Sequence, residues 1–168
     1  LKMIVKSGVN EIVATSHYYP HIHTVSSYIN LRGKCIYCLK QATEKSPYGI
    51  LLIPGAEVLV CEQLDQMEGL EELCIKGTKT LLLEMPFKPF NEPLIQTVKN
   101  ISEMGFNVVL AHIDRYSLAA ILNLIEGTTI KVQLNTESLK SHKARKKYMP
   151  LIEDGTVVAL GSDIHGDK

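Results

Sequence analysis

The sequence predicts an α/β fold, and three observations carry this prediction. Short apolar runs rich in β-branched residues alternate with stretches of helical periodicity along all 168 residues. The strand-like runs, such as ILLIPGAEVLV and TVVAL, are almost continuously apolar, which is typical of parallel strands covered on both faces. Neither an internal repeat nor a low-complexity linker divides the chain, so we expect one domain over residues 1–168.

Turn residues and periodicity set the elements of the first half. A helix that ends at Gly8 precedes the strand EIVAT, because glycine favours the position just after a helix. The next helical stretch contains Gly33 as a weak point, and the apolar run that follows is interrupted by Pro54 and Gly55. A short acidic helix then leads to the strand TLLLE. These predicted strands cover 11–15, 48–61 and 80–84, and the helices cover 26–44 and 61–73.

The second half repeats the alternation more regularly. An amphipathic helix ends before Gly105, and the strand NVVLA follows it. A second helix ends before Gly127, the strand IKVQL comes next, and a basic helical stretch leads to TVVAL. These predicted strands cover 107–111, 130–134 and 156–160, and the helices cover 93–104, 117–125 and 137–152.

Composition excludes several classes of protein. Lys+Arg and Asp+Glu are both 18, which argues against a nucleic-acid partner held by bulk positive charge. We find no apolar run long enough for a membrane span and no signal-peptide pattern at the N-terminus. The four cysteines do not form a disulfide scaffold and are expected as reduced thiols. We therefore expect a cytoplasmic protein.

Histidine or acidic residues follow five of the six predicted strands. In parallel α/β folds, active sites are built at the carboxyl ends of the strands. The residues in question are His17 after EIVAT, Glu57 after LLIPGA, Glu84 after TLLL, His112 after NVVLA, and Asp163 and His165 after VVALG; IKVQL offers only the amides of Gln133 and Asn135.

This mixture of imidazole and carboxylate groups predicts a metal site. Nitrogen and oxygen ligands together suit Zn²⁺, Mn²⁺ or Fe²⁺ better than Ca²⁺ or Mg²⁺. Carboxylates crowded at one edge would repel each other unless a cation compensated them. Bridging carboxylates are characteristic of hydrolases that use several metal ions to activate water.

The ordered segments GVNEIVATSHYY, IPGAEV, TLLLEMPF, GFNVVLAHIDRY and ALGSDIH resemble the PHP (polymerase and histidinol phosphatase) superfamily. The EMPF and AHIDRY segments resemble its bacterial protein-tyrosine phosphatase branch, the CpsB/YwqE type of capsule and exopolysaccharide synthesis. The resemblance implies a distorted (β/α)7 barrel with up to three metal ions, Mn²⁺ or else Fe or Zn²⁺. Its metal ligands would be His17, Glu57, Glu84, His112, Asp163 and His165.

The resemblance also implies individual roles. Glu57 would bridge two ions, Glu84 and His112 would complete one of these, and Asp163 would serve the other; the two remaining histidines would hold the third ion. Arg115 in HIDRY matches the phosphate-contacting arginine of the family, so Arg115 and Asp163 are the expected catalytic residues. The expected substrate is protein phosphotyrosine, on a tyrosine autokinase that controls capsule synthesis.

The chain departs from the family pattern at its start. The family opens with a strand that ends in His-x-His, and this sequence begins after that point, so we expect a fragment that lacks the first βα unit. Six strands where seven are expected agree with this interpretation. Exposed sheet edges would then favour self-association, as a possible homo-oligomer.

Two alternative functions remain open. The chain could be a PHP phosphatase for a small metabolite such as histidinol phosphate, or a non-catalytic remnant that binds a kinase partner. The Cys35-x-x-Cys38 pair has the spacing of a redox or zinc site, although core or interface cysteines are the simpler interpretation.

Overall fold

Strands and helices alternate through the computed structural model, which describes residues 8–44 and 50–163. The predicted helix before Gly8 lies outside these residues. Six strands occur in the described part of the chain, and their order in the sheet follows their order in the sequence, β1-β2-β3-β4-β5-β6. The strand pairs β1–β2, β4–β5 and β5–β6 are parallel. The α/β class with parallel strands is therefore confirmed.

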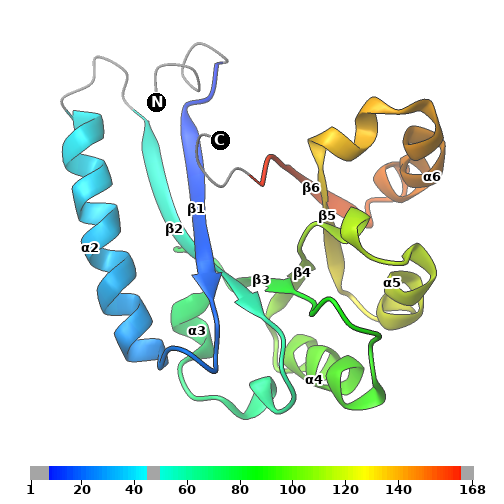
Figure 1. Cartoon of the computed structure of the whole chain (residues 1–168), viewed down its shortest axis with the longest axis horizontal. Coiled ribbons are helices and arrows are strands. Elements are labelled where there is room, and N and C mark those ends of the chain that lie inside the picture. Colours follow the sequence, from blue (N-terminus) through cyan, green and yellow to red (C-terminus); the bar gives the residue numbers. More distant parts are fainter. Residues whose placement is uncertain (1–7, 45–49, 164–168) are drawn as a thin grey trace. The chain divides into compact units, whose positions relative to one another are not determined.

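The chain forms two compact units (Figure 1). Unit 1 comprises residues 1–59 and 67–82, and unit 2 comprises residues 60–66 and 83–168. The strand β3 (Thr80–Glu84) begins in unit 1 and ends in unit 2. The expectation of a single PHP-like domain over residues 1–168 stays a prediction.

Unit 1 is built on the parallel pair β1 (Glu11–Tyr18) and β2 (Leu51–Leu59). The helix α2 (Val25–Glu44) runs alongside this pair, as Figure 1 shows. Tyr28 fixes the helix to the strands, because its buried hydroxyl donates a 2.7 Å hydrogen bond to the carbonyl oxygen of Ser16. The short helix α3 (Leu70–Leu73) completes the unit.

The strand β2 runs through Pro54 and Gly55 without the predicted interruption. Pro54 has no N–H to donate, but its carbonyl oxygen still accepts a 2.8 Å hydrogen bond from the amide of Lys76. Gly55 allows a close approach, since a β carbon there would lie 3.1 Å from Thr15 and 3.2 Å from Ile75. Pro54 and Gly55 therefore allow close packing at this point of β2 and do not end the strand.

Unit 2 is a regular alternation of helices and parallel strands (Figure 1). Asn91 caps its first helix by accepting a hydrogen bond from the amide of Leu94, and Ser141 caps the last one in the same way with Ala144. After the end of β3, its elements are α4 (Glu92–Glu103), β4 (Asn107–Leu110), α5 (Leu118–Ile125), β5 (Lys131–Asn135), α6 (His142–Glu153) and β6 (Val157–Gly161).

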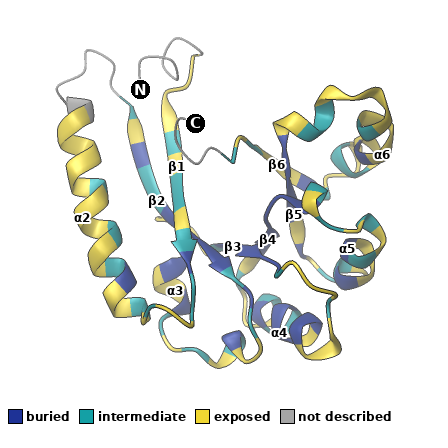
Figure 2. Ribbon diagram, in the orientation of Figure 1, coloured by how far each residue is buried: buried dark blue, intermediate teal, exposed yellow. Residues whose placement is uncertain are grey.

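The core of unit 2 lies along its strands and the inner faces of its helices. Figure 2 shows β4 as largely buried, and β5 is exposed only at its first residue. The apolar periodicity of α4 and α5 directs one face of each helix inward. Fully buried side chains of this core include Leu94, Val98, Ile101, Leu110, Ile121, Leu124, Val132 and Leu134.

Two predicted helices are shorter or broken in the structure. Residues 61–73 form only a 3₁₀ turn, Leu64–Gln66, and the single turn α3, because Gln63 and Gly69 adopt positive φ angles of 64° and 83° that no helix continues. The basic stretch divides at Ser141 into a 3₁₀ turn, Thr136–Lys140, and α6.

None of the described helices has both the length and the apolar character of a membrane-spanning segment.

Cys35 and Cys38 lie exposed on α2 instead of in a core, whereas Cys74 is buried.

Candidate metal centre

His17 and Glu57 form the first of three side-chain pairs among the predicted site residues. The parallel register of β1 and β2 pairs these two positions directly. His17 Nδ1 lies 3.5 Å from Glu57 Oε1, and the carboxylate is buried while the imidazole is 29% exposed. The His17 ring also stacks on Tyr19 at 5.4 Å between centroids. Neighbouring strands of unit 1 thus place an imidazole and a buried carboxylate side by side.

Glu84 and His112 form the second pair, in unit 2. The amide of Ala111 donates a 2.9 Å hydrogen bond to the carbonyl oxygen of Leu83, which aligns the ends of β3 and β4. His112 Nε2 lies 3.5 Å from Glu84 Oε1, and their side chains are only 1% and 8% exposed. His112 itself has a left-handed backbone, with φ 32° and ψ 54°.

In each pair, the two side chains are placed so that both can bind the same cation. Burial of a carboxylate is unfavourable unless a partner or a metal compensates its charge. Two ligand atoms held about 2.0–2.2 Å from one tetrahedral ion lie about 3.4 Å apart, close to the 3.5 Å seen in each pair. The nitrogen and oxygen donors suit Zn²⁺, Mn²⁺ or Fe²⁺. Each pair can therefore hold part of a metal site.

Arg115 and Asp163 form the third pair, also in unit 2. Arg115 ends the 3₁₀ turn Ile113–Arg115 that follows His112, and its guanidinium makes an ion pair with the Asp163 carboxylate. The arginine side chain is 31% exposed, so its remaining N–H groups can reach a ligand from solution. Asp163 has a positive φ of 47°. A carboxylate has two oxygens and can contact a guanidinium and a cation at once.

The structure thus brings the predicted residues together as pairs within each unit. Of the nine residues predicted for metal ligation or phosphate contact or noted as strand-end amides, one, His165, lies outside the described residues. That His17, Glu57, Glu84, His112 and Asp163 share one metal centre stays a prediction.

An aromatic cluster lies beside His112, and it was not predicted from the sequence. Tyr116 lies 6.0 Å from the His112 ring and donates a 2.5 Å hydrogen bond to the carbonyl oxygen of Met85. Phe87 stacks on Tyr116 at 5.7 Å and is itself 73% exposed, and Phe90 packs against Tyr116 at the same distance. The EMPF and HIDRY segments contain Phe87 and Tyr116, and Phe90 follows EMPF by three residues, but only the fold brings these rings together.

From the sequence, no role was predicted for the amides at the end of β5, Gln133 and Asn135. The amide of His112 donates a 2.5 Å hydrogen bond to Gln133 Oε1, and Asn135 donates two hydrogen bonds to the carboxylate of Asp114. Both amide side chains are buried. They contact the turn that carries His112 and Arg115.

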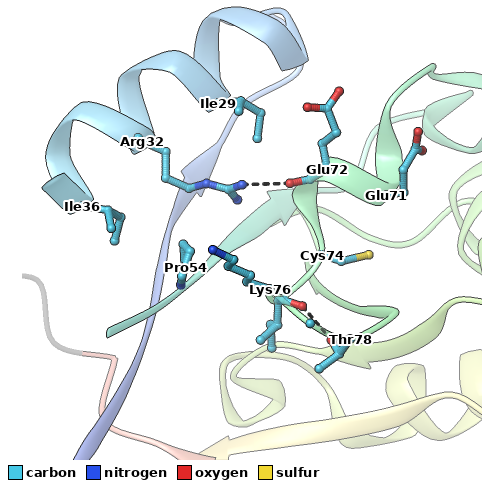
Figure 3. Close-up of a pocket in the computed structure, with 12 residues that line it drawn as sticks. Ile29, Arg32, Ile36, Pro54, Glu71, Glu72, Cys74, Lys76 and Thr78 are labelled. Carbon is cyan, nitrogen blue, oxygen red and sulfur yellow. Dashed lines mark hydrogen bonds between the residues drawn. The ribbon is translucent and has the colours of Figure 1, made fainter. Parts of the chain in front are cut away.

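A hollow of about 490 Å³ lies on unit 1, apart from the predicted site residues (Figure 3). Arg32 reaches across it and donates hydrogen bonds to the carbonyl oxygens of Gly55 and Glu72. Burial, and secondarily Glu71, raises the pKa of the Cys74 thiol at its wall. Its lining mixes two cations, two anions and apolar side chains, so it selects no single class of ligand.

Comparison with solved structures identifies the fold. The chain matches one from a crystallographic study of YwqE from Bacillus subtilis and CpsB from Streptococcus pneumoniae, described there as unique metal-dependent tyrosine phosphatases. The match has a TM-score of 0.77 and 20% sequence identity, and it covers 99% of this chain and 70% of that chain. At this identity the likeness establishes the fold.

Comparison with protein families identifies the group. No curated protein matches the chain significantly. The family model described as capsular polysaccharide synthesis, CpsB/CapC, matches residues 1–168. The chain therefore belongs to the CpsB/CapC family of capsular polysaccharide synthesis.

Proposed function

We propose that this protein is a metal-dependent phosphatase that hydrolyses phosphotyrosine on proteins. The observation that carries the proposal is the buried Glu84–His112 pair of unit 2, whose histidine directly precedes the short turn that ends at the exposed Arg115. Such a site combines ligands for a cation with a group that binds phosphate. Family membership and the fold shared with described tyrosine phosphatases support the same conclusion.

The proposed roles follow from the chemistry of each side chain. Within unit 2, Glu84 and His112 would hold one ion, and within unit 1, His17 and Glu57 form a second pair of proposed metal ligands. A bound divalent ion lowers the pKa of water and compensates charge on a leaving oxygen. Mn²⁺, Fe or Zn²⁺ all suit this donor set, with up to three ions in the complete site.

Arg115 binds the phosphoryl group of the substrate. Its planar guanidinium can donate two parallel hydrogen bonds to phosphate oxygens, while Asp163 keeps it oriented. Asp163 also remains a proposed metal ligand, and His165 is proposed from its position after VVALG in the sequence and from the resemblance.

The aromatic cluster favours a tyrosyl substrate over a small aliphatic phosphate. Phe87 presents an exposed ring that stacks on Tyr116, and Tyr116 lies beside His112. An aromatic substrate ring can pack against this face, and such contacts contribute about 0.5–1.5 kcal/mol. We therefore expect Phe87→Ala to raise the KM for a phosphotyrosyl peptide roughly 2- to 12-fold, with little effect on a small alkyl phosphate.

The natural substrate is proposed to be a bacterial tyrosine autokinase of capsule assembly. The family description places the chain in capsular polysaccharide synthesis, which is consistent with such a partner. Cytoplasmic location and self-association stay predictions.

Phosphate release from a phosphotyrosyl peptide, with and without Mn²⁺, tests the proposal. Turnover should require the metal and should be abolished by His112→Ala and by Asp163→Ala, because each removes a proposed ligand. His142→Ala is the matched control, since His142 is an exposed histidine of the same unit.

Two outcomes would contradict the proposal. Faster turnover of histidinol phosphate than of the peptide would favour a phosphatase for small metabolites. Absence of turnover in a protein that binds Mn²⁺ would favour a non-catalytic protein that binds a kinase.

A further inference from the structure

The segment that carries His112 and Arg115 is a short turn with an unfavourable backbone. His112 has a left-handed conformation, which is unfavourable for a residue other than glycine. The 3₁₀ turn Ile113–Arg115 follows it directly. A conformation of this kind persists only where its surroundings fix it, and the contacts that do so come from β5.

Gln133 fixes the beginning of this turn. The backbone amide of His112 donates a 2.5 Å hydrogen bond to Gln133 Oε1, and Gln133 Nε2 donates in turn to the carbonyl oxygen of Leu134 at 3.2 Å. Gln133 is only 8% exposed, so both ends of its amide are used within the protein. Gly161 on β6 leaves room for this side chain, because a β carbon there would overlap Gln133 Nε2.

Asn135 fixes the other end, two residues further along the same face of β5. Its backbone amide donates a 2.9 Å hydrogen bond to Asp114 Oδ1, and its side-chain Nδ2 donates a 3.3 Å hydrogen bond to Asp114 Oδ2. The bond from Nδ2 sets the orientation of the side-chain amide, because the flipped orientation would face Asn135 Oδ1 toward a carboxylate.

This orientation has an energetic consequence for Asn135. Its Oδ1 is buried and has no hydrogen-bond partner among the residues that the structure describes. An unsatisfied buried polar atom is rare in native proteins and calls for an explanation. The two-point contact with Asp114 provides one, because it requires the carbonyl oxygen to point away.

We propose that Gln133 and Asn135 are positioning residues for the metal and phosphate groups of unit 2. Gln133 holds His112 at one end of the turn, and Asn135, through Asp114, holds Arg115 at the other. This inference rests on the proposed function, which assigns metal binding to His112 and phosphate binding to Arg115. Neither amide touches the metal or the substrate; each acts through the turn.

The variants Gln133→Leu and Asp114→Ala test this proposal. The first removes the acceptor for the His112 amide while keeping a similar volume, and the second removes the two-point contact. Asp114→Asn is the conservative variant, since its side-chain oxygen can still accept the bond from the Asn135 amide. Gln96→Leu is the matched control, because Gln96 is an exposed amide of the same unit.

Mn²⁺ affinity of the folded protein is the first readout, measured by titration below the melting temperature of each variant. Loss of a group that orients a metal ligand typically lowers affinity 10- to 100-fold. We expect a loss of about this size for Gln133→Leu and Asp114→Ala, a smaller loss for Asp114→Asn and none for Gln96→Leu. A merely structural role would lower the melting temperature and leave the Mn²⁺ affinity of the folded protein unchanged, which would overturn the proposal.

Hydrogen exchange of the His112 amide in the unmodified protein is the second readout, and it needs no variant to fold. The bond to Gln133 predicts strong protection of this amide, and exchange at the rate of an exposed amide would overturn the proposal. Mn²⁺ binding without phosphatase activity would contradict the proposed function alone. A wild-type protein that binds no Mn²⁺ would overturn both.

Discussion

The substitution Gly161→Ala tests the packing between β5 and β6 with a single methyl group. Gly161 is the register partner of Asn135 and ends β6. Its φ is not positive, so alanine can adopt the backbone without strain. The added β carbon would nevertheless overlap the side-chain nitrogen of Gln133. Gln133 therefore has to move.

The expected loss follows from what Gln133 leaves behind. His112 is only 1% exposed, so its backbone amide is buried, and this amide would lose its acceptor. A buried donor left unsatisfied costs about 1–3 kcal/mol. In a chain of this size, 1 kcal/mol shifts the melting temperature by about 2–4 °C, so we expect a decrease of roughly 2–12 °C.

Urea unfolding and thermal melting of Gly161→Ala and of a matched variant, Gly33→Ala, measure this effect. A β carbon at Gly33 would meet nothing within 4 Å, and Gly33 lies within α2 at an ordinary φ. Alanine there should stabilise the helix by about 0.5–1 kcal/mol. The two glycines should thus change stability in opposite directions. If Gly161→Ala were as stable as the wild type, Gln133 would not occupy the position that the proposed role requires.

Two further predictions concern a helix cap and two thiols, one half-buried and one buried. Asn91→Ala should lower the free energy of unfolding by about 0.5–2 kcal/mol in a urea titration, because the amide of Leu94 loses its cap; an unchanged midpoint would show that Asn91 does not cap α4. Burial raises the pKa of the Cys61 and Cys74 thiols, so these thiols stay protonated to a higher pH in the folded state than in the unfolded state. The stability that this provides is complete below the ordinary thiol pKa of about 8.5 and is lost as the pH rises through the folded values. Stability should therefore fall above about pH 8.5, and less steeply in Cys74→Ala; identical pH profiles would contradict this.

Elements whose signals are local could be predicted from the sequence. The strand Thr80–Glu84 has the predicted bounds, because its apolar run Leu81–Leu83 lies between the polar residues Thr80 and Glu84. The helices α4 and α5 differ from prediction by one residue at most at either end, since glycines and capping residues mark their termini. Local conformation overrode helical composition at Gln63 and Gly69, whose positive φ angles prevent a helix over residues 61–73.

Some residues of the candidate site could likewise be predicted from the sequence, whereas the contacts around them could not. His17, Glu57, Glu84 and His112 could be identified because each follows an apolar run, and parallel strands end at a common edge. The contacts of Gln133 and Asn135 with the His112–Arg115 turn depend on the register between β4 and β5, which residue spacing does not contain. The stacking of Phe87 on Tyr116 likewise joins residues 29 positions apart through the fold.

Anomalous diffraction from crystals grown with Mn²⁺ tests the metal centre most directly. We expect a manganese peak bonded to His112 Nε2 and a Glu84 carboxylate oxygen, and loss of this peak in His112→Ala crystals grown under the same conditions. A wild-type crystal with manganese bound only elsewhere, or with no manganese at all, would contradict the assignment of these residues as metal ligands.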